Sequence, residues 1–265
     1  MAALAAGSAA GCAPLFGRPR TFTYAPERNL QLDVYPTPAP NGIAAVLVHG
    51  GAWQTGDRRS RFGRHAHHLA ARGITPIAID YRLTLDGARW PAPAQDVQAA
   101  IRWVRAHAGE LGVDPAHLYA IGESAGGHLS AWCAVAADDP SGRPDALAAL
   151  YAPWDLSVPR SAWQPRIDAA IDLLMGDQDR ADASPLLRIS ANTPPTLLIH
   201  SHNDDVVPFA QSEAAHGALT AAGVESQFIA WNGIDHGWSG PGVAARMMAQ
   251  AGDFAAKIWP HRFQT

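Results

Sequence analysis

The stretch HLYAIGESAGGHL, residues 117–129, decides the fold of this chain of 265 residues. Its apolar first half predicts a buried strand, and its second half begins an apolar helix that we expect over residues 124–137. Between them lies the pattern G-x-S-x-G, in which a serine sits on a sharp turn from strand to helix. The flanking glycines leave room for the strained backbone that such a turn requires. We therefore expect Ser124 to be exposed at the start of a helix, where the helix dipole favours negative charge.

Strands and helices alternate along the rest of the chain. Apolar runs of strand length predict strands at residues 21–25, 30–36, 43–50, 74–81, 146–153, 195–202 and 225–231. Longer apolar and amphipathic runs predict helices at residues 61–72, 93–108, 209–222 and 243–259. This alternation indicates an α/β protein with a mostly parallel sheet of about eight strands and helices on both faces. Ligands of such sheets bind at the carboxyl ends of the strands, so the functional residues are expected in the loops there.

The composition favours one globular domain. With 48% hydrophobic residues and no internal repeat, residues 21–265 are expected to form a single α/β domain, preceded by a tail over residues 1–20. Residues 153–193 break the alternation and are expected to form a small lid-like insertion. The net charge of −4 argues against a nucleic-acid partner, and no apolar run approaches the roughly 18 residues of a transmembrane span.

The first twelve residues, MAALAAGSAAGC, leave two interpretations open. A run of small and apolar residues that ends in Cys12 is similar to the cleavage site of a bacterial lipoprotein signal, which would make Cys12 a lipid anchor and place the protein in the cell envelope. The run is short and lacks a basic beginning, so a disordered alanine-rich tail on a cytoplasmic protein is equally compatible with it.

Ser124 needs a base, because a serine hydroxyl does not ionise near neutral pH. His236 lies in the glycine-flanked segment GIDHGW, which follows the last predicted strand at the same edge of the sheet. The base must in turn be oriented by an acid, and the strand that ends in HSHNDD supplies Asp204 and Asp205. The chain order serine, acid, histidine is that of α/β-hydrolases. The residues alone do not choose between the two acids.

Acyl transfer also needs hydrogen-bond donors for the negative charge that develops on the carbonyl oxygen. The segment HGGAW, residues 49–53, follows a predicted strand, and its glycines let backbone amides turn inward. We expect the amides of Gly51, Ala52 and Ala125, the last of which follows the serine directly, to form the oxyanion hole.

Two other functions fit parts of the sequence. His200, His202 and Asp204 have a spacing that can hold a metal ion, which predicts a metal hydrolase. That interpretation needs further ligands from other strand ends, and it leaves HGGAW and GESAGG without a role. A non-catalytic binding protein of the same fold is the other alternative, although the chain contains a candidate for each member of a catalytic triad.

Taken together, the segments HGGAW, DYRL, GESAGGHL, NDDVVP and DHGW resemble those of α/β-hydrolase carboxylesterases, a family that includes hormone-sensitive-lipase-like enzymes, arylformamidases and bacterial acetyl or feruloyl esterases. The matching segments span residues 43–239. In this family the acid stands four residues before a proline, which implies Asp204 as the acid and leaves Asp205 at a helix start. The chain departs from the family pattern in two places: HGGAW lacks the third glycine of the lipase-like group, and Ser201 replaces a usual glycine.

The resemblance implies a serine carboxylesterase that hydrolyses small to medium esters through a Ser124–His236–Asp204 triad and an acyl-enzyme. Neither a cofactor nor a metal is expected, and the expected partner is a small ester. An arylformamidase-like amide hydrolase and an acetyl or feruloyl esterase acting on carbohydrate-linked esters are the alternatives. The acyl chain, the alcohol and the oligomeric state stay open.

A substrate pocket is expected around the serine. Four tryptophans are expected to form an aromatic wall of this pocket, and Glu123 is a fifth candidate. The pocket candidates are Trp53, Glu123, Trp154, Trp163 and Trp238. The alternative for each tryptophan is ordinary packing between a loop and the core.

Overall fold

One sheet runs through the protein in a computed structural model that describes residues 17–60, 63–137, 139–237, 240 and 242–264. Its strands follow the order β1-β2-β4-β3-β5-β6-β7-β8. Strand β2 pairs antiparallel with β1 and with β4, and all other neighbouring strands are parallel. The strands are β1 (Arg20–Ala25), β2 (Leu30–Val34), β3 (Ala44–Val48), β4 (Thr75–Ile79), β5 (Leu118–Glu123), β6 (Ala146–Leu150), β7 (Thr196–Ser201) and β8 (Ser226–Trp231).

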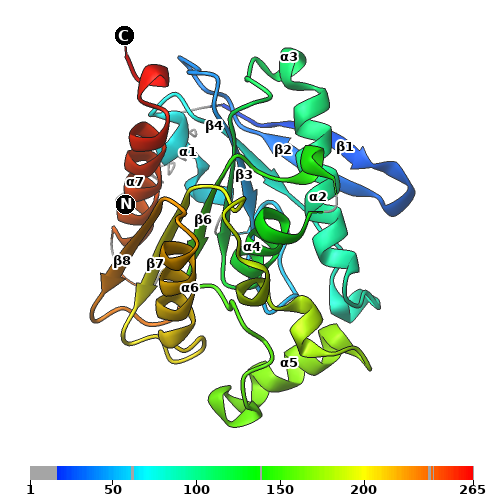
Figure 1. Cartoon of the computed structure of the whole chain (residues 1–265). Helices are drawn as coiled ribbons and strands as arrows, with labels where there is room; N and C mark the ends of the chain where they lie inside the picture. Colours follow the sequence, from blue (N-terminus) through cyan, green and yellow to red (C-terminus); the bar gives the residue numbers. More distant parts are fainter. Residues whose placement is uncertain (1–16, 61–62, 138, 238–239, 241, 265) are drawn as a thin grey trace, which may run out of the picture.

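Helices cover both faces of this sheet. They are α1 (Ala66–Ala70), α2 (Ala92–Ala106), α3 (Ala108–Leu111), α4 (Ala125–Ala136), α5 (Pro165–Met175), α6 (Ala210–Ala221) and α7 (Val243–Ile258). Helices α1 and α7 pack on one face, and α2, α4 and α6 pack on the other (Figure 1). Helix α5 lies beyond the carboxyl ends of the strands, and its buried face joins the core beneath α2 and α4 (Figure 1). No helix in the described ranges is long and apolar enough to cross a membrane.

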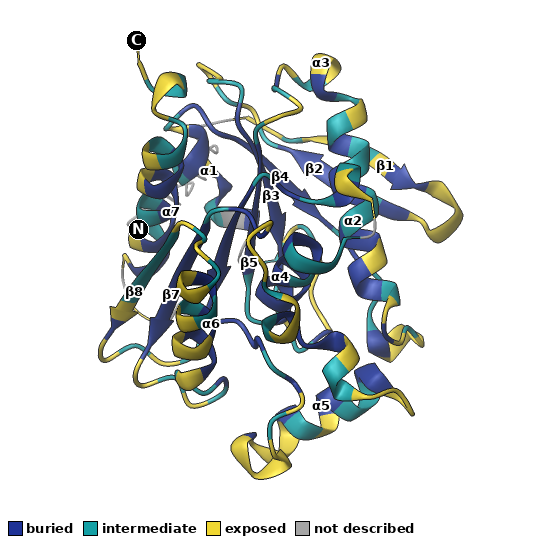
Figure 2. Ribbon diagram, in the orientation of Figure 1, coloured by how far each residue is buried: buried dark blue, intermediate teal, exposed yellow. Residues whose placement is uncertain are grey.

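The central strands are buried on both sides. Successive side chains of a strand point to opposite faces, so β3 contributes Val46 to the core beneath α2 and α4, and Leu47 to the core beneath α1 and α7. Leu47 pairs with Ile121 of β5, which enters the same core. Figure 2 shows the resulting dark centre, which explains why these strands are near-continuous apolar runs in the sequence.

The predicted fold class is confirmed, although the first helix is shorter than expected. The first predicted helix shrinks to α1, which follows a 3-10 turn over Gly63–His65. Gly73 ends this region with a φ of +78°, and a Cβ there would lie 2.7 Å from the carbonyl oxygen of Ala39. Gly73 thus sets the turn into β4. Residues 61 and 62, where the predicted helix was expected to begin, lie outside the described residues. Cys12 and the tail around it lie outside the described residues.

The turn from β5 into α4 is the closest approach in the sheet region. Ser124 has a φ of 50° and a ψ of −120°, which a residue with a side chain rarely adopts. A Cβ on Gly126 would lie 2.1 Å from the carbonyl oxygen of Val48 and 2.4 Å from that of His49. A Cβ on Gly122 would lie 2.2 Å from the carbonyl oxygen of Gly126. These glycines let the start of α4 rest directly on the end of β3.

We predict that Gly126→Ala lowers the free energy of unfolding by about 1–3 kcal/mol, because backbone atoms must shift to admit the methyl group. Gly217→Ala is the matched control, since Gly217 lies inside α6 and a Cβ there meets nothing within 4 Å. The control is expected to gain about 0.5–1 kcal/mol from its better helix propensity. Denaturant unfolding of both variants checks the pair, and equal effects in the two glycines would contradict the packing argument.

Candidate active site

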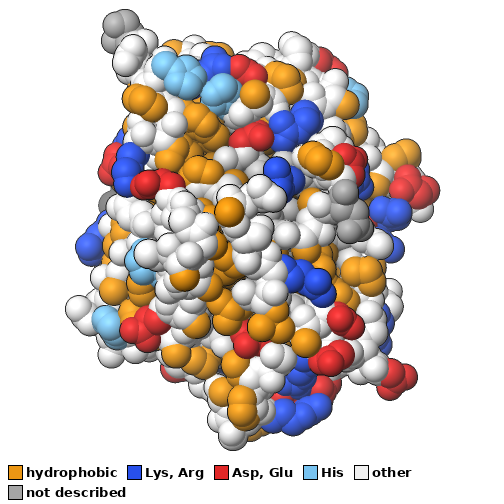
Figure 3. All heavy atoms as spheres, viewed as in Figure 1, with side chains coloured by type: hydrophobic (Ala, Val, Ile, Leu, Met, Phe, Trp, Pro, Cys, Tyr) orange, Lys and Arg blue, Asp and Glu red, His pale blue; other side chains and the backbone are white. Residues whose placement is uncertain are grey.

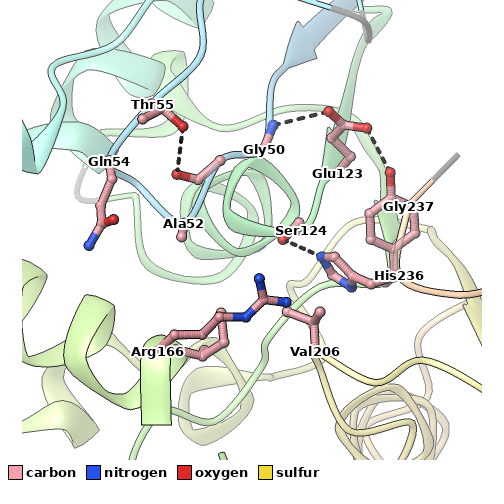
Figure 4. Close-up of a pocket in the computed structure, with 13 residues that line it drawn as sticks. Gly50, Ala52, Gln54, Thr55, Glu123, Ser124, Arg166, Val206, His236 and Gly237 are labelled. Carbon is pink, nitrogen blue, oxygen red and sulfur yellow. Dashed lines mark hydrogen bonds between the residues drawn. The ribbon is translucent and has the colours of Figure 1, made fainter. Parts of the chain in front are cut away.

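The structure brings Ser124, His236 and Asp204 together at the carboxyl edge of the sheet. Nε2 of His236 lies 2.9 Å from Oγ of Ser124, and Nδ1 of the same ring lies 2.8 Å from Oδ2 of Asp204. Because a carboxylate only accepts, Nδ1 carries the proton, and Nε2 is left to accept the hydrogen bond from the serine hydroxyl. The serine follows β5, the acid follows β7 and the histidine follows β8, so three distant segments converge. Figure 4 shows the contact between Ser124 and His236.

Asp204 is almost fully buried and uses both oxygens. Oδ1 accepts hydrogen bonds from the amides of Val206 and Val207, at 2.9 and 2.8 Å. Oδ2 accepts from His236 and also from Nε2 of His200, at 3.1 Å. Burial alone raises the pKa of Asp204, but the hydrogen bonds from the two histidines outweigh it and hold the pKa well below its usual range. The carboxylate therefore stays ionised throughout the neutral pH range.

Asp205, the neighbouring acid, has a different place. Its side chain is not part of the network around His236, and its carbonyl oxygen accepts a hydrogen bond from the side chain of Gln164. The expectation that Asp205 starts the next helix is wrong, because α6 begins only at Ala210. The loop between the two positions is needed to return the chain from the edge of the sheet to the face that α6 covers.

The two histidines near Asp204 do not face a common point. His200 is buried, its Nε2 donates to Asp204 and to the carbonyl oxygen of Val207, and its Nδ1 accepts from the Ser212 hydroxyl at 2.7 Å. His202 is exposed, and its ring centre lies 3.9 Å from that of Phe209. Within the described ranges no three histidine, cysteine or acidic side chains are arranged to hold a metal ion. The spacing that suggested a metal thus places one histidine as a second partner of the buried acid.

The HGGAW loop lies against the serine turn. The amide of Gly50 donates to Oε1 of Glu123 at 3.3 Å, and the carbonyl oxygen of Gly51 accepts from the amides of Gln54 and Thr55. Gly51 and Ala52 have positive φ values of 119° and 53°, the second of which is strained for a residue with a side chain. This turn of the loop includes Gly51 and Ala52, which line the same cavity as Ser124.

The amides expected to form the oxyanion hole donate no hydrogen bond to another described residue. Those of Gly51, Ala52 and Ala125 donate to no described acceptor. Gly51 and Ala52 line the same cavity as Ser124, and Ala125 is the first residue of α4. Unused amides beside a nucleophile are available to a developing oxyanion.

Glu123 and Tyr151 connect two loops of the site by hydrogen bonds. Oε2 of Glu123 accepts from the Tyr151 hydroxyl at 2.6 Å, so the carboxylate connects Tyr151 with the HGGAW loop. The Tyr151 ring lies edge-on to His236, with centres 4.9 Å apart. Tyr151 was missed in the sequence, although it directly follows β6 at the edge where site residues gather.

A cavity of about 430 Å³ opens above Ser124. It is lined by residues of the HGGAW loop, of the serine turn, of α5 and of the loops after β6, β7 and β8, namely Gly50, Gly51, Ala52, Gln54, Thr55, Glu123, Ser124, Tyr151, Arg166, Ile167, Val206, His236 and Gly237. Of the predicted pocket residues that the structure describes, only Glu123 belongs to this lining. Arg166 and Ile167 belong to the segment expected to act as a lid, and no motif in the sequence pointed to them.

The predicted aromatic wall is wrong for three of its four tryptophans, and Trp238 lies outside the described residues. Trp53, Trp154 and Trp163 are at most 5% exposed, pack in the hydrophobic cores and do not line the cavity. An indole carries a large apolar surface, and the space between the loops and the sheet offers more burial than the cavity does.

Trp53 instead anchors the HGGAW loop in the core, where it contacts His128 of α4. Its Nε1 donates to Nδ1 of His128 at 3.2 Å, and Nε2 of His128 donates to the carbonyl oxygen of Ala183 at 2.7 Å. Burial lowers the pKa of His128 to about 4, so the ring stays neutral and keeps an acceptor for the indole. The loop is thereby tied through α4 to the segment 153–193.

Comparison with known proteins agrees with this geometry. The BD-FAE family model matches residues 32–219. The chain belongs to this family. It therefore belongs to the α/β-hydrolase carboxylesterases, which confirms the resemblance seen in the sequence.

Several relatives support the same family. The probable carboxylic ester hydrolase LipM of Mycobacterium tuberculosis is 34% identical over 201 residues, which cover 68% of this chain and 46% of LipM. Esterase LipQ of the same organism is 30% identical over 253 residues, covering 87% of this chain and 60% of LipQ. The chain thus spans about half the length of these curated relatives. Thermogutta terrifontis esterase 2, phosphonylated by sarin, superposes with a TM-score of 0.80 at 28% identity, covering 91% and 95% of the two chains.

We predict that Asp204→Asn lowers the free energy of unfolding by about 2 kcal/mol at pH 7, because hydrogen bonds to a charged group are lost. The lowered pKa of Asp204 stabilises the folded state fully at pH values above the ordinary aspartate pKa of about 3.9. This stabilisation is lost progressively as the pH falls from there toward the lower pKa of the folded state. The difference in stability between the variant and the parent should therefore shrink below pH 4. Asp205→Asn is the control, with no effect expected at either pH. Denaturant unfolding at pH 7 and pH 3.5 gives the answer, and a loss that is as large at pH 3.5 would contradict the assignment.

Proposed function

We propose that the protein is a serine carboxylesterase that cleaves small to medium esters. The observation that carries the proposal is the 2.9 Å contact between Ser124 and His236, in a cavity that also presents unused amides. A serine hydroxyl bonded to the free nitrogen of an oriented histidine is an activated nucleophile. The cavity volume of about 430 Å³ suits a substrate of small to medium size.

In the proposed reaction Oγ of Ser124 attacks the ester carbonyl carbon while Nε2 of His236 takes its proton. The carbonyl electrons move to oxygen, where the amides of Gly51, Ala52 and Ala125 stabilise the negative charge. The intermediate collapses, the carbon–oxygen bond to the alcohol breaks, and His236 returns the proton to the leaving alkoxide. An acyl-enzyme remains on Ser124.

Water completes the cycle by the same route. His236 takes a proton from water, the hydroxide attacks the acyl carbon, and Ser124 leaves with that proton as the acid is released. Asp204 holds the ring in one tautomer and stabilises the imidazolium that forms twice in each turnover. His200 and the amides of Val206 and Val207 in turn hold Asp204, so the acid cannot rotate away from His236.

Two features of the T. terrifontis esterase 2 structures support the proposal. That enzyme is phosphonylated by sarin, and we extend this reactivity to Ser124, which would be the nucleophile here. The same enzyme has been solved with propionate and with butyrate bound. Short acyl groups are accordingly the first substrates to test, with 4-nitrophenyl acetate, propionate and butyrate as a series.

We expect Ser124→Ala to lower kcat/KM for 4-nitrophenyl butyrate by at least about 10³-fold and to abolish labelling by an organophosphate. Ser130→Ala is a matched control, because Ser130 is a buried serine of the same helix whose hydroxyl has no partner among the described residues. The control should keep the parent rate and the label. Turnover of the ester by Ser124→Ala at the parent rate would overturn the proposal.

The roles of the adjacent acids are separated by Asp204→Asn and Asp205→Asn. We predict that Asp204→Asn lowers kcat by about 10³–10⁴-fold, since an amide can donate to His236 and favour the wrong tautomer. Asp205→Asn should stay within about twofold of the parent. Steady-state rates at pH 7.5 decide between them, and a larger loss in Asp205→Asn would move the acid by one residue.

A further inference from the structure

Arg166 brings an unpaired positive charge to the cavity. It is the second residue of α5, and its side chain runs from that helix toward Ser124 and His236 (Figure 4). Within the described residues it forms no hydrogen bond and no ion pair, although it lines the same cavity as the serine. A guanidinium is charged at every physiological pH and presents five donors in a planar fork.

Both acids of α5 are paired with other arginines of the surrounding segment. Arg160 and Arg180 contact Asp168 and Asp172 at distances of 2.6 to 2.7 Å. Figure 3 shows red and blue side chains side by side at the foot of the molecule, where α5 lies. Both acids of α5 are therefore occupied, and neither stands three or four residues from Arg166, the spacing that pairs side chains on a helix.

The position of Arg166 does not serve the stability of α5. A helix dipole is positive at its N-terminus, so a cation in the first turn is unfavourable there. The favourable acid in the first turn of α5 is Asp168, as it is Glu213 in α6. Arg166 is exposed and unpaired, it is badly placed for the dipole, and its side chain lines the cavity of the serine, an arrangement that an anionic ligand explains.

The acids of the site leave Arg166 free for such a ligand. Glu123 accepts from Tyr151 and Gly50, and Asp204 accepts from His236, His200 and two amides. Figure 4 places Glu123 on the far side of Ser124 from Arg166. The positive charge therefore faces open cavity rather than a carboxylate of the protein.

We propose that Arg166 binds a carboxylate on the substrate, so that the preferred esters carry a second, ionised carboxyl group besides the ester bond. This inference rests on the proposed function, because it assigns the substrate class of the same cavity. A guanidinium and a carboxylate match as a two-point, charge-assisted pair, which gives the pair direction as well as affinity. Ile167 and Val206 line the cavity beside it and would contact the carbon chain between the two functional groups.

The carboxylate can belong to either half of the ester. With its carbonyl oxygen turned to the amides of Gly51 and Ala52, a bound ester extends away from the HGGAW loop, and Figure 4 shows Arg166 on that other side of Ser124. Two pairs of substrates separate the halves. The acyl half is tested by the 4-nitrophenyl half-ester of adipic acid against 4-nitrophenyl 6-methylheptanoate, and the alcohol half by 4-acetoxybenzoate against 4-isopropylphenyl acetate. In each pair an isopropyl group replaces the carboxylate at equal size.

The measurement is the ratio of kcat/KM for the charged ester over its neutral partner. We expect this ratio to fall about tenfold in Arg166→Gln in one of the two pairs and to fall further in Arg166→Glu. Arg166→Lys should lie between the parent and Arg166→Gln, because lysine keeps the charge and loses the two-point geometry. Raising the salt concentration from about 20 mM to about 500 mM should lower the ratio of the parent more than that of Arg166→Gln. Ratios that stay within about twofold of the parent in both pairs, for Gln and Glu alike, would overturn the inference.

Arg18→Gln is the matched control, since it removes one exposed positive charge that does not line the cavity. It should leave both ratios unchanged, and a shift equal to that of Arg166→Gln would also overturn the inference. The neutral esters separate this result from the proposed function. If cleavage of the neutral esters depends on Ser124 while the ratios stay unchanged, the inference that Arg166 binds a carboxylate is refuted and the proposed esterase function stands. Neutral esters cleaved equally well by Ser124→Ala refute the esterase and the inference with it.

Discussion

The structure depends on one close contact, in which the start of α4 rests on the end of β3. A single methyl group on Gly126 would lie 2.1 Å from the carbonyl oxygen of Val48, so the contact exists only because that position has no side chain. It places Ser124 beside the HGGAW loop, which leaves β3 at the same point. The nucleophile and the expected oxyanion donors are therefore positioned by the same backbone approach, and neither can be moved without the other.

The acid is held by a second constraint, which follows from burial. A carboxylate inside the protein is unfavourable unless its oxygens are fully bonded, and Asp204 meets this condition with two amides and two histidines. The bonds that stabilise the charge also fix its direction. The stability of the loop after β7 and the orientation of His236 are thus two results of one hydrogen-bond network.

The sequence predicts those parts of the site that backbone geometry imposes. The serine turn needs glycines at fixed positions, and the histidine and acid follow strands at one edge, so Ser124 and His236 could be selected from the residues. The acid was limited to Asp204 or Asp205, and only the family resemblance implied Asp204, which the structure places against His236. The aromatic wall failed because tryptophans near a cavity in sequence are still drawn into the core, as Trp154 is. Arg166 was missed because it sits on an irregular insertion, where neither periodicity nor a motif predicts which side chain reaches the serine.

This difference between the two halves of the site has a physical origin. The parts that would perform the chemistry leave the carboxyl edge of a sheet whose central strands are buried on both faces (Figure 2), and partly buried hydrogen bonds connect them. The inner face of helix α5 is buried, because Ile171, Leu174 and Met175 pack in the core that α2 and α4 also join. Arg166 stands outside that core, since it is exposed and pairs with no described residue, so this position can change its side chain without loss of core packing. A reaction class can therefore be inferred from residues that the sheet backbone positions, whereas the substrate depends on exposed side chains that the fold leaves free to vary.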